Sequence, residues 1–350
     1  MRLFISHQSA LEYWRLHHDT PHISASRRMV SLPNTPPKMD LLQAEKIEGL
    51  AHPLHAMLGS PNARRVSCPV IQHVYTGKTP AGCFVNAGEG IMITSPEFCF
   101  LQLADELPLV NLIELGYELC GTYSMPEAAA SKSAAAVQPE EPALLSREER
   151  NFLMLNRNVV PDEESAALIR GFHNRLPLTS KKKLETFLDQ MPGAKNHKKA
   201  VRAIRYLSDE SASPMETKLA MLLTLPYKLG GYHFPMPKHN SHIVPVKTAK
   251  RGASKVHYAC DLFWPDYGLA VEYDSDSYHT GSERIASDSK KRNALALMGI
   301  TVITVTSQQI RSVSELEKVV HVLAGNMGRR LWNDAQGFSA AHRELRKLLA

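Results

Sequence analysis

The sequence contains few cysteines, and they lie far apart. Its five cysteine residues form none of the close pairs that hold structural zinc or begin a disulfide framework. They are Cys68, Cys83, Cys99, Cys120 and Cys260. This spacing argues against a zinc finger and against a small disulfide-rich secreted domain. We therefore expect reduced thiols that are mostly buried.

Long apolar runs are also missing. No run approaches the ~20 apolar residues that a helix needs to cross a bilayer. Residues 1–6 are too short an apolar stretch for the core of a secretory signal. We expect a cytoplasmic protein that does not enter a membrane.

The bulk composition is that of a globular protein with an excess of basic residues. A hydrophobic fraction of 43% is ordinary for such proteins. The length of 350 residues exceeds what one core usually supports, so two or three domains are expected. The net charge of +6 favours a polyanionic partner such as nucleic acid, although charge alone does not identify one.

Changes in composition divide the chain into five parts. Ala, Ser, Pro, Gln and Glu dominate residues 126–145, which cannot bury enough apolar surface to fold and are predicted to form a flexible linker. Before this linker we predict an α/β domain, 1–125, and after it a basic helical segment, 146–212. A region of mixed helices and strands, 213–312, and C-terminal helices, 313–350, complete the chain.

Local signals place elements on both sides of the linker. Short β-rich runs at 70–75 and 90–94 predict strands in the N-terminal domain. A helix is predicted to begin at Ser95, with Ser as the cap and Pro96 in the first turn. Residues 146–149 have the form of a capping box, which predicts that helices follow the linker.

Basic residues recur at helical spacing within 146–212. Lys195, Lys199 and Arg202 share one face of a predicted helix, as do Lys198, Arg202 and Arg205. Such a face could meet the phosphates of a nucleic acid. The alternative is a solvated helix surface, which is the commoner role of a run of charges.

From residue 213 the pattern is helix, two strands, helix and strand. The predicted elements are a helix opening at Ser213, strands at 257–264, 269–274 and 300–306, and a basic amphipathic helix at 286–298. Pro-Asp-Tyr-Gly at 265–268 predicts the turn of a hairpin between the first two strands. A further capping box at 314–317 predicts the start of the last helices.

The hairpin brings acidic side chains together. With the turn at 265–268, Asp261 lies opposite Glu272, and Asp274 shares the face of Glu272. Like charges so close destabilise a sheet unless a cation offsets them. Oxygen ligands without Cys or His indicate Mg²⁺ or Mn²⁺, with Asp261, Glu272 and Asp274 as its ligands.

Each of these acidic assignments has a plainer alternative. The hairpin carboxylates could simply face solvent, although Asp is depleted in strands. Glu216 could be a fourth member of the acidic centre, or it could be the Glu of a capping box that begins at Ser213. The two roles compete for one carboxylate, and the sequence leaves both open.

A helix Glu, a strand Asp and then Glu-x-Asp on the next strand resemble the PD-(D/E)xK nuclease superfamily, and in particular its very-short-patch-repair-like branch. The matching residues are Tyr258, Asp261, Leu262, Trp264, Pro265, Val271, Glu272, Asp274, His279, Asp288, Arg292, Leu295 and Gly299. The resemblance covers residues 213–312. It implies a restriction-endonuclease-like core, a mixed sheet flanked by helices, that hydrolyses phosphodiesters with Mg²⁺ or Mn²⁺. Asp261 and Glu272 would be the principal ligands, and Asp274 or Glu216 would bind a second ion or a water.

One position departs from the pattern of the superfamily. The lysine two positions after the Glu is Asp274 here. That lysine usually positions or activates the attacking water, so His279, Lys291 and Arg292 are the candidates for its role, and a less assisted water is the alternative. Lys291 and Arg292 are also expected to contact nucleic acid.

The N-terminal domain resembles the regulatory domain of type IV abortive-infection antitoxins. The resemblance covers residues 90–123, with Thr-Ser-Pro-Glu at 94–97 and Gly-Tyr-Glu-Leu at 116–119. It implies that this domain binds a protein partner or a second copy of the chain. An unrelated α/β domain is the alternative, because a Ser-Pro-Glu helix start arises in many such domains.

These observations favour a metal-dependent DNA endonuclease that acts in defence or repair. One alternative is a nuclease fold that has lost catalysis and regulates through binding of nucleic acid, in line with the missing lysine. Another is a toxin-like ribonuclease. The sequence does not distinguish DNA from RNA as the substrate.

Overall fold

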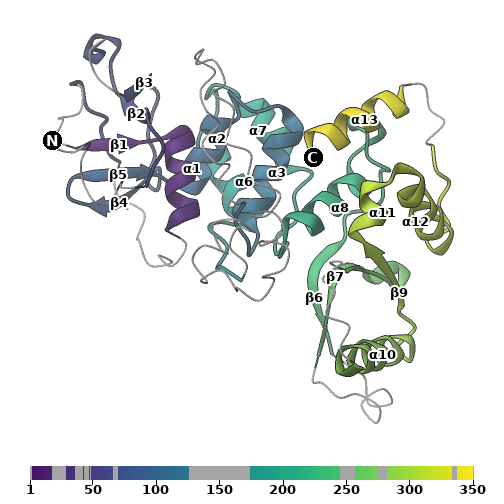
Figure 1. The fold of residues 1–350 in the computed structure, drawn as a ribbon. Coiled ribbons are helices and arrows are strands. Elements are labelled where there is room, and N and C mark those ends of the chain that lie inside the picture. The colour runs from purple at the N-terminus through teal and green to yellow at the C-terminus, as the bar shows by residue number, and fades with distance from the viewer. Residues whose placement is uncertain are drawn as a thin grey trace, which may run out of the picture.

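The computed structural model describes residues 2–17, 29–35, 42, 47, 49–65, 70–125, 174–244, 257–274, 282–332 and 337–349. The predicted linker at 126–145, the capping box at 146–149 and His279 lie outside these residues. The described chain forms two mixed β-sheets flanked by helices (Figure 1), which confirms the predicted α/β class. No helix within the described ranges combines the length and apolarity that a membrane span requires.

The first sheet lies in the N-terminal region. Its strands are β1 (Leu3–Ile5), β2 (Leu54–Leu58), β3 (Val70–Val74), β4 (Phe84–Gly88) and β5 (Ile91–Thr94). Their order is β3-β2-β1-β5-β4, with parallel β2–β3 and β1–β5 pairs and antiparallel β1–β2 and β4–β5 pairs. The strands predicted at 70–75 and 90–94 are β3 and β5, and the other three strands were not predicted.

Helices α1 (His7–Leu16) and α2 (Pro96–Leu103) pack on this sheet, and α3 (Leu109–Cys120) follows them. The start of α2 is as predicted, because the backbone N–H of Phe98 donates to Ser95 Oγ at 3.3 Å and Pro96 occupies the first turn. Nearly every residue of α2 is buried, which is why its sequence reads as an almost continuous apolar run.

The centre of the molecule is helical. It contains α6 (Lys181–Asp189), α7 (His197–Ile204) and α8 (Pro214–Thr224), and α3 packs against both α7 and α8. The predicted cap at Ser213 is present, since its Oγ accepts the backbone N–H of Glu216 at 3.2 Å. Helix α3 also meets the end of the chain, where Asn111 Nδ2 donates to the carbonyl of Leu348 at 3.3 Å.

The second sheet carries the predicted hairpin. Its strands are β6 (Lys238–Ile243), β7 (Tyr258–Trp264), β8 (Leu269–Asp274) and β9 (Thr301–Thr306), in that order. The first two pairings are antiparallel and β8–β9 is parallel. Between β7 and β8 the chain turns through a 3₁₀ turn at Pro265–Tyr267 and Gly268, whose φ of 55° favours glycine. Strand β6 was not predicted.

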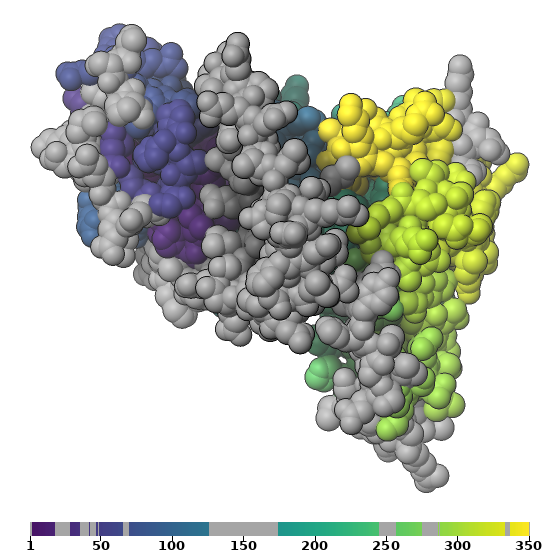
Figure 2. Space-filling view, viewed as in Figure 1, coloured from purple at the N-terminus to yellow at the C-terminus, as the bar shows by residue number. Residues whose placement is uncertain are grey.

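The remaining helices are α10 (Ser282–Ala296), α11 (Ser307–Arg311), α12 (Val313–Asn326) and α13 (Phe338–Leu348). Helices α10 and α11 contact β9 of the second sheet, α12 packs on α11, and α13 packs against α3 and the 3₁₀ turn Tyr227–Leu229. The prediction that α12 begins at a Ser314 capping box is wrong, because Ser312 is its cap and accepts the N–H of Glu315 at 3.3 Å. In the space-filling view, light-green residues are visible in the lower right part of the molecule, where Figure 1 places α10 (Figure 2).

One large cluster of buried apolar residues runs through both regions, with members from Leu3 to Leu349. A smaller cluster lies between the second sheet and α10 and includes Ala270, Leu295 and Ile300. The described cysteines are free and buried, as predicted, and Cys68 lies outside the described residues. The domain boundaries drawn from composition stay a prediction.

Candidate metal centre

Strands β7 and β8 keep the predicted register next to the turn, and Asp261 and Glu272 lie where the regular pairing ends. The last regular pair of β7 and β8 is Leu262 with Val271, so the next position sets Asp261 beside Glu272. At this position a side chain helps to join the two strands. The backbone N–H of Tyr273 donates a hydrogen bond to Asp261 Oδ2 at 2.7 Å. The Asp261 carboxylate is therefore held in one orientation at the middle of the sheet.

Polar residues extend this pair into a row across the sheet. Thr304 on β9 pairs with Glu272. On the other side, the β6–β7 register places Asn240 beside Asp261, between two regularly paired positions. Asn240 has a φ of 43°, which interrupts the regular strand at this position. All four strands of the sheet thus contribute one polar residue to the row.

Glu216 reaches the same place from the first turn of α8. It is 8% exposed, and its carboxylate accepts hydrogen bonds from the N–H of Ala212 (3.0 Å), the hydroxyl of Ser213 (2.9 Å) and Asn240 Nδ2 (3.0 Å). The expected capping box is thus modified, because Glu216 bonds the N–H of Ala212 and not that of Ser213. Asn240 links this helix carboxylate to the row on the sheet.

The charges in this centre oppose one another. Burial, followed by the negative charges of Glu216 and Glu272, raises the pKa of the Asp261 carboxyl to about 7 from its ordinary value of 3.8. The hydrogen bond from Tyr273 and the charge of Lys291 act in the other direction and do not cancel the rise. The two sequence alternatives for Glu216 are therefore compatible, since it caps α8 and also acts electrostatically on Asp261.

A lysine from α10 enters the centre. Lys291 Nζ lies 2.7 Å from Glu272 Oε2, and both side chains are mostly shielded, at 23% and 20% exposure. The second carboxylate oxygen of Glu272, Oε1, is buried and accepts no hydrogen bond within the described part of the chain. The Cys260 thiol also interacts with the Glu272 carboxylate, and burial and Glu272 together raise the pKa of this thiol to about 12, so it stays protonated.

A cavity of about 270 Å³ opens between β8, β9 and α10. Glu272 and Asp274 line it from the sheet, and Asp288, Lys291 and Arg292 line it from the helix. Asp274 and Arg292 are exposed. The cavity therefore presents carboxylates and basic groups to solvent side by side, directly next to the Asp261–Glu272 pair.

The donors at this centre are of the type that a hard divalent cation prefers. No three ligand atoms of its described carboxylates lie within 4.8 Å of one another, so the carboxylates would have to move closer together to hold an ion. Asp261, Glu272 and Glu216 supply only oxygen, which Mg²⁺ and Mn²⁺ prefer. Glu272 Oε1 is a buried oxygen without a hydrogen bond from the described residues, and leaving such a group bare costs free energy. A cation bound between these carboxylates would also relieve the repulsion that raises the pKa of Asp261.

The predicted basic helix lies elsewhere. Helix α7 packs on α3 and α6, and Figure 1 places the acidic hairpin beyond α8. Lys195 pairs with Asp105 at 2.6 Å, and Lys199 donates to the carbonyl of Leu107. Two of the predicted phosphate ligands are thus engaged by the N-terminal region. The other face of the helix is exposed, and its basic residues are Lys198, Arg202 and Arg205.

We expect the exposed face alone to contribute to nucleic-acid binding. Reversing Lys198, Arg202 and Arg205 to Glu should lower the slope of log affinity against log salt by about 2–3, because each phosphate contact contributes about 0.9. The double reversal of Lys182 and Lys183, exposed on α6, is the control and should leave the slope unchanged. Equal slopes for wild type and triple variant would make α7 a solvated surface only.

One feature of the centre was not found from the sequence. Asn240 stands in a segment of Lys, His, Asn and Ser that carries no strand signal. Lys291 was one of three candidates for the role of the motif lysine, and its approach to Glu272 depends on how α10 packs. His279 lies outside the described residues. Comparison with known proteins adds no relative, because no family model, curated protein or solved structure matches the chain.

Proposed function

We propose that this chain is a metal-dependent nuclease that hydrolyses phosphodiester bonds, with DNA as the favoured substrate. The observation that carries the proposal is that Glu216 and Glu272 act electrostatically on the Asp261 carboxylate in a site where a lysine lies 2.7 Å from Glu272. Buried, mutually repelling carboxylates cost stability, so a purely structural origin for this arrangement is poorly supported. The resemblance to the PD-(D/E)xK superfamily, carried by the same residues, points the same way.

Asp261 and Glu272 would hold the ion, and Glu216 would complete the acidic side of the site. When bound, Mg²⁺ or Mn²⁺ supplies Lewis-acid stabilisation of the phosphoryl group and lowers the pKa of water. Lys291 is placed to donate a hydrogen bond to a phosphoryl oxygen, where it would balance developing negative charge. Asp274 and Asp288, which line the same cavity, are placed to accept the proton that the attacking water loses.

Lys291 also bears on the competing function of an inactive regulator. That alternative is based on the absence of a lysine two positions after Glu272. An ammonium group 2.7 Å from Glu272 supplies the same charge from another element, so the missing motif residue does not by itself imply lost activity. We therefore place the active enzyme ahead of the inactive regulator.

The direct test is cleavage by the purified full chain. Plasmid DNA, linear duplex, single-stranded DNA and structured RNA are each incubated with Mg²⁺, with Mn²⁺ and with a chelator. The proposal requires divalent-dependent cleavage of at least one nucleic acid. Cleavage of RNA alone would identify a toxin-like ribonuclease, and cleavage that persists in chelator would contradict the metal centre.

The variant Glu216→Gln distinguishes a structural role of Glu216 from a catalytic one. In Glu216→Gln the amide oxygen can accept from the N–H of Ala212, and the amide NH₂ can donate to the Ser213 hydroxyl that now bonds the other carboxylate oxygen, so the α8 cap should persist and the melting temperature should change little. If the negative charge at 216 serves the metal centre, we expect the cleavage rate to fall by roughly 10²-fold. The measurement is the rate across a range of Mg²⁺ concentrations.

Ser213→Ala is the matched control for this variant. It removes the hydroxyl that caps α8 and should cost ~1 kcal/mol of stability, while every charge in the centre remains. A Glu216→Gln protein that cleaves as fast as wild type at all Mg²⁺ concentrations would remove Glu216 from the catalytic site. Its role would then be the helix cap and the contact with Asn240.

A further inference from the structure

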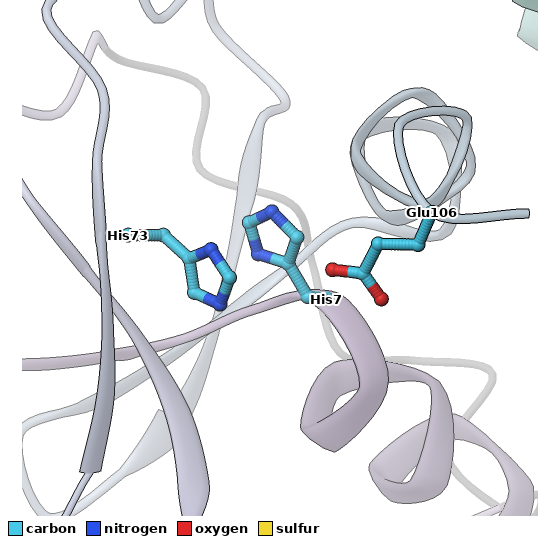
Figure 3. A group of neighbouring side chains, drawn as sticks. All are labelled: His7, His73 and Glu106. Carbon is cyan, nitrogen blue, oxygen red and sulfur yellow. The ribbon is translucent and has the colours of Figure 1, made fainter.

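A second group of metal-binding side chains lies in the N-terminal region, far along the chain from the carboxylate centre. His7 begins α1, His73 lies on β3 and Glu106 lies in the turn after α2. Figure 3 shows the His7 ring between His73 and the Glu106 carboxylate, which points toward it. One ligand atom from each of the three residues lies within 4.8 Å of the other two.

The two imidazoles are stacked and each is held through one nitrogen. The rings of His7 and His73 are 3.5 Å apart at 14°. His7 Nδ1 lies 3.0 Å from Ser6 Oγ, and His73 Nε2 lies 3.1 Å from Nδ1 of His55. When these nitrogens donate, the lone pairs of His7 Nε2 and His73 Nδ1 remain, and neither atom has a hydrogen bond among the described residues. Metal-binding histidines are commonly oriented in this way, through the ring nitrogen that does not bind the metal.

The surroundings keep these rings neutral, as ligands must be. Burial and the nearby His73 and His55 lower the pKa of His7 to about 3. Burial, with His55 and then Arg64, lowers the pKa of His73 to about 4. Asp105 raises both pKa values but does not restore them, because burial and the neighbouring imidazoles act more strongly. No protons need to leave the imidazoles before a cation binds at neutral pH.

We propose that His7, His73 and Glu106 form a binding site for a divalent transition-metal ion of the zinc class. Two imidazoles and one carboxylate suit Zn²⁺ or Co²⁺ and disfavour Mg²⁺, so this site is chemically distinct from the proposed nuclease centre. The lone pairs of an imidazole lie in the plane of its ring, and in two rings stacked at 14° they do not converge on one point, so the rings would rotate out of the stack when the ion binds.

The bound ion has room for a further ligand. Three protein ligands leave one position of a tetrahedral ion open. A cavity of about 290 Å³ adjoins both histidines and is also lined by Arg64, Lys195 and Asn196. An anion could therefore reach the open position. The ion itself would join the start of α1, strand β3 and the turn after α2, three segments that are distant in sequence.

The test is a titration of the full chain, freed of metal with a chelator, with Co²⁺ followed by visible absorption and then by displacement with Zn²⁺. We expect one saturable equivalent with the spectrum of Co²⁺ bound through imidazole nitrogen, in addition to any Co²⁺ taken up by the carboxylate centre. His73→Gln should weaken binding by at least about 10–100-fold, since even loss of an orienting residue commonly costs that much. Glu106→Gln should weaken it too, and because Glu106 is exposed this change leaves the fold intact.

His242→Gln is the matched control. His242 and His257 form another imidazole pair, with ring centres 4.8 Å apart, and both are exposed. The proposal requires that His242→Gln keeps the Co²⁺ site and that Glu106→Gln or His73→Gln loses it. The proposal would be overturned if only His242→Gln lost Co²⁺ binding, or if the wild type bound no Co²⁺ saturably. Asp261→Asn should bind Co²⁺ at this site normally, so the result is independent of the nuclease proposal.

Discussion

Asp261→Asn is expected to abolish divalent-dependent cleavage, with a loss of roughly 10²–10³-fold or more in rate. The amide keeps the shape of the side chain and can still accept the N–H of Tyr273, so the hairpin should stay folded. It lacks the negative charge that a divalent cation needs. Cleavage rates are compared at saturating Mg²⁺ and Mn²⁺. The variant Asn240→Ala retains all three carboxylates and therefore reports how much the polar row contributes to the cleavage rate by itself.

The same variant should be more stable than wild type when metal is absent. In the unfolded chain the Asp261 carboxyl ionises near 3.8, and in the folded chain its pKa is about 7. Between these values the folded state binds a proton that the unfolded state has released, so stability falls as pH rises, by up to about 4 kcal/mol. Above pH 7 the whole penalty is present.

Chemical denaturation of the chelator-treated proteins from pH 4 to pH 8 measures this difference. Asp261→Asn should lose the part of the pH dependence that lies between about 4 and 7 and should gain most over wild type near pH 8. Mg²⁺ should narrow the gap by stabilising only the wild type. A variant that is less stable than wild type at pH 8 would show that Asp261 is not held under repulsion.

Lys291→Met should have the second-largest effect on the cleavage rate. It removes the ammonium group next to Glu272 while keeping most of the length of the side chain, and we expect a rate loss of roughly 10²-fold. Mg²⁺ should bind at least as well as in wild type, since the carboxylates remain and a competing cation has gone. Single-turnover cleavage together with calorimetry separates the two quantities.

Lys290→Met is the control for this prediction. Lys290 is the preceding residue of α10, is exposed, and does not line the cavity. The variant Lys290→Met should leave the cleavage rate and Mg²⁺ binding unchanged. If Lys291→Met cleaves at the wild-type rate, the ion pair with Glu272 is structural, and the function of the missing motif lysine passes to Arg292, to His279 or to water alone.

The hairpin and its acidic face could be predicted because local rules fix them. Alternation of side chains sets the faces of β7 and β8, and the turn at 265–268 sets their register, which the pairing of Leu262 with Val271 confirms. Gly268 adopts the positive φ that the turn requires, and the carbonyl of Gly299 would lie 2.8 Å from an added Cβ. These constraints act over a few residues and are visible in the sequence.

The rest of the centre depends on contacts that local rules do not determine. Strand β6 has a half-polar sequence and is stabilised by pairing with β7, so its sequence carries little strand signal. The link from Asn240 to Glu216 and the reach of Lys291 to Glu272 depend on packing between elements distant in sequence. The separation of α7 from the acidic hairpin is equally a property of the tertiary structure.

The histidine group in the N-terminal region illustrates the same limit. His7, His55 and His73 are separated by dozens of residues and have no motif spacing. They meet because β2 and β3 pair in parallel and because α1 starts just after β1, the strand next to β2, where His7 has a φ of 51°. No periodicity within any one segment would have predicted this cluster.

Calorimetric titration of Mg²⁺ into the chelator-treated full chain at pH 8 tests the central claim most directly. Mg²⁺ does not suit the imidazole group, so the heat reports the carboxylate centre alone. We predict saturable binding to wild type that is lost in Asp261→Asn and retained in His73→Gln. No saturable heat with wild type, or equal binding by Asp261→Asn, would contradict a metal centre at Asp261, Glu272 and Glu216.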